Sequence, residues 1–121
     1  MSELQRDFTA MGHEIARDAL RAEMEADGGM RGLFDMLRDP DPQLQHKVMS
    51  KYGLLMSAAT SDADRLQKAR EFQENPMAWE RQAEVDMLRA IAGGIHEEDA
   101  PAMLMAMHVH RIAYPDAEPA L

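Results

Sequence analysis

The 121-residue sequence contains no cysteine. It can therefore form neither a disulfide nor a thiolate metal site, and it has no cysteine nucleophile. It also lacks long hydrophobic runs, since no stretch approaches the roughly 18 consecutive apolar residues of a membrane-spanning helix. Its polar and acidic first residues have neither the basic start nor the apolar segment of a secretory signal. We therefore expect a cytoplasmic protein.

Basic residues are scarce. Lys and Arg together number 13 against 22 Asp and Glu, which gives a formal net charge of −9 at pH 7. A negative protein repels both phosphate backbones and anionic lipid surfaces. The charge therefore argues against nucleic acid and membranes as direct partners.

Aromatic residues are also few, at 5% of the chain with a single Trp, whereas Met is abundant with 12 residues. Hydrophobic residues make up 45% and charged residues 29%, a composition typical of a folded chain. The length suits one domain. We predict a single helical domain over residues 1–114 with a methionine-rich core, followed by a flexible C-terminal tail over residues 115–121.

Apolar spacing and helix-capping residues predict an all-α fold, a compact bundle of five to six helices with a long N-terminal helix. The expected helices cover residues 2–27, 30–38, 42–59, 62–74, 76–92 and 100–113. Their boundaries come from local signals: Gly28-Gly29 and Gly93-Gly94 as helix ends, Asp41-Pro42 and Asn75-Pro76 as a cap followed by proline, and Ser61 with Asp64 as a capping box.

Each expected helix carries apolar residues at steps of three or four, which predicts the side that faces the core. In the first helix these are Leu4, Phe8, Met11, Ile15, Ala19, Ala22 and Ala26; in the third, Leu44, Val48, Tyr52, Leu55 and Ala59; in the fourth, Leu66, Ala69 and Phe72; in the fifth, Trp79, Ala83, Met87, Leu88 and Ile91. The sixth is apolar on nearly every side, as a central helix should be.

Motifs that carry chemistry are missing. The sequence has no Glu-x-x-His or His-Glu-x-x-His spacing for a metal, no glycine-rich phosphate loop and no Gly-x-Ser-x-Gly turn. We therefore predict a non-enzymatic protein without a cofactor.

One helix face suggests a ligand site. Met103, Met107 and His110 follow one another at steps of four and three, so their side chains line one face of the last helix. Thioether and imidazole groups suit a soft metal ion such as Cu(I). A helical bundle that binds a soft metal or a small molecule here is therefore an alternative to a plain core helix.

Acidic side chains form two further groups. Glu14 and Asp18 lie one helical turn apart on the first helix, and Glu80 and Glu84 do so on the fifth. If both groups share one surface, the protein could imitate nucleic acid and inhibit a nucleic-acid-binding protein. This is a further alternative.

Four methionines lie near expected helix ends or loops, where they could be exposed together: Met24, Met30, Met36 and Met77. Methionine is flexible and polarisable, and it is frequent on surfaces that adapt to different partners. The sequence therefore favours a small acidic protein-binding module, an adaptor, chaperone-like factor or inhibitor. Its predicted site is a Met-rich apolar groove rimmed by the four carboxylates, and its predicted partner is a basic protein, with a homodimer as the alternative.

Overall fold

The computed structural model describes the backbone of residues 3–116 and the side chains of residues 11–116. Within this range the regular structure is helical and no strand is present, which confirms the predicted all-α fold. The elements are α1 (Glu3–Ala26), α2 (Gly29–Leu37), α3 (Pro42–Ala59), α4 (Asp62–Glu74), α5 (Ala78–Ala92), the 3-10 turn η1 (Glu97–Asp99) and α6 (Ala100–Ala113). Most of the predicted tail, residues 117–121, lies outside the described residues.

Most helix boundaries follow the local signals. Gly28 and Gly29 have φ values of 96° and 75°, the left-handed conformation that favours glycine, and they separate α1 from α2. The Asp41 side chain accepts a hydrogen bond from the Gln43 N–H at 3.0 Å and caps α3. At α4 the Ser61 side chain and the Asp64 side chain bond each other's backbone N–H, which completes the predicted capping box.

The boundary between α4 and α5 differs from the prediction. Asn75 does not cap α5; it ends α4, and its backbone N–H donates to the Glu71 carbonyl at 2.9 Å. The residue before a proline is driven out of the helical conformation, and Asn75 accordingly has φ −145° and ψ 82°. A turn through Pro76 and Met77 follows, so α5 begins at Ala78.

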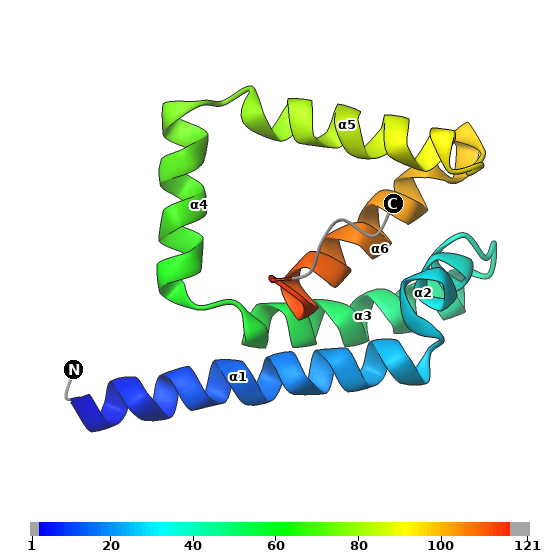
Figure 1. Cartoon of the computed structure of the whole chain (residues 1–121). Helices are drawn as coiled ribbons and strands as arrows, with labels where there is room; N and C mark the ends of the chain where they lie inside the picture. Colours follow the sequence, from blue (N-terminus) through cyan, green and yellow to red (C-terminus); the bar gives the residue numbers. More distant parts are fainter. Residues whose placement is uncertain (1–2, 117–121) are drawn as a thin grey trace.

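The helices of this compact all-α fold pack against one another to different degrees. In Figure 1, α1 runs alongside α3, and α2 lies against the start of α6. The chain then leaves α3, turns upward as α4 and returns as α5, so that α3, α4 and α5 form three sides of an open frame crossed by α6. Helix α4 packs mainly against α5, while α5 packs against α6.

The core lies where α6 crosses α1, α2 and α3. Its largest fully buried side chains are Leu20 and Met24 from α1, Leu33 and Phe34 from α2, and Met103 and Val109 from α6. The prediction that the last helix is central is confirmed. The predicted face of α3 is confirmed as well, since Val48, Tyr52 and Ala59 are buried and Leu44 and Leu55 pack against the core.

The predicted core face of α1 is wrong over its described side chains. Met11 and Ile15 are exposed, whereas Leu20 and Met24 are buried. The two pairs lie on different sides of the helix, and the side with Leu20 and Met24 faces α3 and α6 because these larger side chains fill the core better than Ala19 or Ala22. The side chains of Leu4 and Phe8 lie outside the described residues.

Among the described helices, none combines the length and the hydropathy that crossing a bilayer requires.

Candidate functional site

Helix α4 buries none of its side chains. The prediction that Leu66, Ala69 and Phe72 face inward is wrong, because all three are exposed. The main contact that α4 makes is at its end, where the rings of Phe72 and Trp79 meet edge to face with centroids 6.3 Å apart. Helix α4 therefore stands beside the core with its few apolar side chains uncovered.

Helix α5 is covered on one side only. Its buried residues are Asp86 and Ala90, which lie one turn apart and face α6. The residues predicted to face the core, Trp79, Ala83, Met87, Leu88 and Ile91, are exposed instead. Leu88 is two positions from both Asp86 and Ala90, about 200° around the helix, so it points away from α6 and is 67% exposed. A helix that is apolar on several sides is normally covered on several sides.

Helices α4 and α5 and the turn between them, which together we call the hairpin, carry eight large apolar side chains that are exposed. We call this set the hairpin surface: Leu66, Phe72, Met77, Trp79, Val85, Met87, Leu88 and Ile91. The hairpin is anchored at α6 by an ion pair between Asp86 and Arg111, with oxygen–nitrogen distances of 2.6 and 2.8 Å. The arrangement presents apolar groups on an anchored support, which suits binding to another apolar surface.

The hairpin carries an ordinary share of the negative charge of the chain. Residues 62–92 contain seven acidic and five basic side chains, a net charge of −2, and they make up about a quarter of a chain whose net charge is −9. Several of these charges pair within α4: Arg65 lies 3.2 Å from Asp62, and Lys68 lies 3.6 Å from Glu71. Of the four carboxylates expected around the docking site, Glu80 and Glu84 lie exposed on α5, whereas Glu14 and Asp18 lie on α1.

The predicted methionine groove does not form. Met24 is 1% exposed and belongs to the core, and Met30 and Met36 are half-buried against that core. Met77 is exposed, but it lies at the turn between α4 and α5, at the opposite corner of the frame from α2. Met24 was expected at the surface because it lies near the end of α1; it is covered because α2 and α6 pack over that end.

The predicted acidic residues are exposed but divided between two helices. Glu14 and Asp18 lie on α1, and Glu80 and Glu84 lie on α5. These helices form opposite edges of the molecule in Figure 1. They do not supply the single continuous surface that imitation of nucleic acid needs.

The predicted soft-metal face is largely internal. Met103 and Met107 are buried in the core. His110 is half-buried, and its ring centroid lies 4.9 Å from that of Tyr114. Burial and, after it, the charge of Arg111 lower the pKa of His110. Among the described residues, no cluster of three or more His, Asp or Glu side chains is placed to hold a metal ion.

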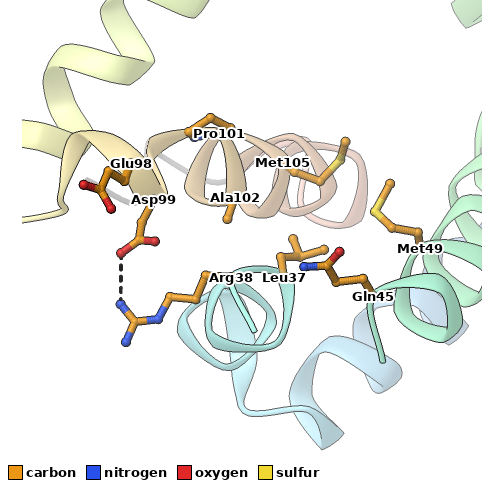
Figure 2. Close-up of a pocket in the computed structure, with 9 residues that line it drawn as sticks. All are labelled: Leu37, Arg38, Gln45, Met49, Glu98, Asp99, Pro101, Ala102 and Met105. Carbon is orange, nitrogen blue, oxygen red and sulfur yellow. Dashed lines mark hydrogen bonds and ion pairs between the residues drawn. The ribbon is translucent and has the colours of Figure 1, made fainter. Parts of the chain in front are cut away.

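A recess of about 420 Å³ lies between the end of α2, the start of α3 and the start of α6 (Figure 2). Its wall includes Arg38 and Asp99, whose side chains pair with each other at 3.3 Å, together with apolar residues such as Met49 and Met105. The charges of Arg38 and Asp99 neutralise each other. The wall of the recess offers no nucleophile with a neighbouring base. We assign no chemistry to it.

The hairpin surface was missed because its apolar spacing resembles that of a core-facing helix. The composition of α4, in contrast, indicates a helix that is largely exposed. Seven of the 13 residues of α4 are charged, which leaves only a narrow apolar stripe, as in helices that lie at the edge of a fold.

Comparisons with protein-family models, with curated proteins and with solved structures found no match to this chain. The interpretation of the hairpin surface therefore rests on its geometry and its chemistry.

Proposed function

We propose that this protein is a non-enzymatic protein-binding module and that the hairpin surface is its docking site. The observation that carries the proposal is the exposure of eight large apolar side chains on two consecutive helices and the turn that joins them. Covering one such side chain fully is worth about 1.5 to 3 kcal/mol. Large apolar side chains that gather exposed on one part of a folded protein commonly mark interaction sites.

The number of large apolar side chains exposed on the hairpin supports recognition by apolar burial rather than by electrostatic attraction. The proposal therefore differs from the sequence-based expectation, since it requires neither a basic partner nor a carboxylate rim. Binding of this kind depends little on salt, because screening weakens interactions between exposed charges and leaves apolar burial in place.

The proposal is tested by purifying tagged chains under native conditions and identifying every bound protein by mass spectrometry. Three variants are compared with the original chain: Leu66→Glu on α4, Leu88→Glu on α5, and Leu54→Glu on α3 as a matched control. Leu54 is 75% exposed but lies outside the hairpin, so the control introduces the same charge at another exposed leucine.

We expect at least one bound protein, counting further copies of this chain, to be lost with Leu66→Glu or Leu88→Glu, retained with Leu54→Glu, and stable to raised salt. A set of bound proteins that is identical for all four chains would refute the proposed function. Circular dichroism of each variant shows that the comparison is made between folded proteins.

A further inference from the structure

We propose that the recess between α2, α3 and α6 binds a peptide segment of another protein in which a Lys or Arg side chain lies two positions from an apolar one. The recess shares no residue with the hairpin surface, so this inference goes beyond the proposed function. Three observations carry it: the recess has an apolar and a charged end, carboxylates outnumber cations at the charged end, and the recess is open to solvent.

The two ends of the recess differ in chemistry. Figure 2 shows Met49 of α3 and Met105 of α6 extending toward each other at one end, and Arg38 of α2 beside Glu98 and Asp99 at the other. Met105 packs against the core, whereas Met49 is 43% exposed. The apolar end is therefore only partly covered. The volume of about 420 Å³ lies within the range of ligand sites.

The charged end continues into a second recess of about 540 Å³, which shares Arg38 and Asp99 and adds Asp35 and Asp39. The two recesses are lined by 12 residues, among them the carboxylates of Asp35, Asp39, Glu98 and Asp99 and the single cation of Arg38. Their net charge is −3, against −9 for all 121 residues of the chain. Negative charge is therefore concentrated here about threefold over the chain average.

The cation of Arg38 is shared between two carboxylates. Its guanidinium lies 3.3 Å from Asp99 and 3.7 Å from Asp35, which also has a long contact of 4.0 Å with Arg31. Within residues 11–116, Asp39 and Glu98 form no ion pair. Carboxylates without a cation attract a positively charged group and repel an anion. The charged end is therefore complementary to a Lys or Arg side chain.

The openness of the recess favours a peptide over a small molecule. Sites for small molecules bury about 70 to 90% of the ligand surface. Here the side chains of Arg38 and Asp35 are 46% and 54% exposed, and Glu98 is exposed as well. Such a surface suits side chains that project from a peptide lying across it. In an extended peptide, residues two positions apart point to the same side, so one can enter each end.

Binding is tested on the full chain with ¹³C-methyl-labelled methionine, because the 12 methionines report on many parts of the molecule. The probe is the peptide acetyl-Ala-Leu-Ala-Arg-Ala-amide, added up to about 5 mM so that weak binding is detected. We expect the methyl signals of Met49 and Met105 to shift. Those of Met11 on α1 and Met77 on the hairpin should stay, because both residues lie outside the recess.

Three control probes separate the parts of the proposal. A peptide with Glu in place of Arg should cause no shift, because the carboxylates repel it. A peptide with Ser in place of Leu should bind more weakly, because it leaves the apolar end empty. Butylamine at the same concentration should cause no shift, because a small amine lacks the second anchor that the peptide supplies.

Substitutions with opposite expected effects test the charged end. Glu98→Lys should weaken binding of the Arg peptide about fivefold, because it replaces an attraction by a repulsion. Arg38→Gln should strengthen binding by a similar factor, because it removes the cation that competes for Asp35 and Asp99. Glu84→Lys on α5 is the matched control, since it makes the same charge change at an exposed position outside the recess. It should alter binding less than twofold. Circular dichroism shows that the variants are folded.

Salt separates this site from the hairpin surface. Binding at the recess should weaken clearly between about 50 mM and 500 mM salt, because screening reduces attraction between exposed charges. The partner of the hairpin surface is expected to be stable to the same change.

Unchanged signals of Met49 and Met105 overturn the proposal. So does equal binding of the Arg and Glu peptides, or equal binding by Glu98→Lys and Glu84→Lys. Shifts confined to Met77 would place the peptide on the hairpin and overturn the site. Butylamine shifts as large as those of the Arg peptide would replace the peptide by a small amine. None of these results bears on the hairpin surface, which the purification in the preceding section judges separately.

Discussion

The carboxylate of Asp86 accepts two hydrogen bonds from the guanidinium of Arg111, at 2.6 and 2.8 Å, and so joins α5 to α6. Gln82 donates a third bond at 3.0 Å. Asp86 is the one charged side chain among residues 11–116 that is buried. Burial alone would raise the pKa of Asp86, but the bonds from Arg111 and Gln82 outweigh it and the pKa is lowered. The pair therefore holds the hairpin on the core.

Removing Arg111 should loosen this attachment. Arg111→Met leaves the buried Asp86 carboxylate without its main partner. The free energy of unfolding should fall by about 2 to 3 kcal/mol, less than for a fully buried pair because Arg111 reaches solvent. Urea denaturation measures the change. The control is Arg81→Met, an exposed position on α5, which should change stability by less than about 0.5 kcal/mol. Equal effects of the two substitutions would contradict the assigned role of the pair.

The same pair predicts a dependence on pH. Because the pKa of Asp86 is lower in the folded protein than its ordinary value of 3.8, the folded state favours the ionised form. Its contribution is complete above 3.8 and is lost as the pH falls through the lowered pKa. The stability difference between the original chain and Asp86→Asn should therefore shrink below about pH 4. Urea midpoints at a series of pH values measure it, and a difference that stays constant into strong acid would argue against this pair.

A second, partly buried contact joins Asp27, the residue after α1, to α3. The Tyr52 hydroxyl donates a hydrogen bond to Asp27 at 2.6 Å, and Lys51 donates to the same carboxylate oxygen at 2.8 Å. Tyr52→Phe should cost about 1.5 to 3 kcal/mol, because the lost bond is to a charged group and Tyr52 itself is buried. Tyr114→Phe is the control, since its bond to Glu25 is exposed and 3.4 Å long. Thermal melts compare the two, and a cost no larger for Tyr52→Phe would show that the bond is weak.

The junction between α1 and α2 requires glycine at position 32. A Cβ atom at Gly32 would overlap the backbone carbonyl of Asp27, which cannot move aside as a flexible side chain could. Gly32→Ala should therefore destabilise the protein by about 1 to 3 kcal/mol. Gly53, within α3, has open space around it, so Gly53→Ala should be stabilising by about 0.5 to 1 kcal/mol. Urea denaturation of both variants checks the opposite signs, and a neutral Gly32→Ala would mean that the junction can relax.

The apolar spacing in the sequence predicted the buried residues of α3 and α6 correctly and those of α4 and α5 wrongly. Val48 and Tyr52 have the same kind of spacing as Leu66, Ala69 and Phe72, yet the first pair is buried and the second set is exposed. Spacing shows that a helix has an apolar side, but it cannot show whether another helix lies against that side.

The methionines show the same limit. Met24 was expected at the surface because of its place near a helix end, and Met11 was expected in the core because of its spacing. The structure reverses both, since α2 and α6 cover the end of α1 while the side that carries Met11 faces no other helix.

By itself the sequence determined the helices and most of their ends, because caps, prolines and left-handed glycines act within a few residues of the chain. It also determined that α6 is central, because a helix that is apolar on nearly every side has no stable place at a surface. Only the tertiary structure decided that α4 and α5 stand apart from the core with an apolar surface uncovered. That outcome depends on how separate helices pack, and packing is a relation between residues distant in sequence.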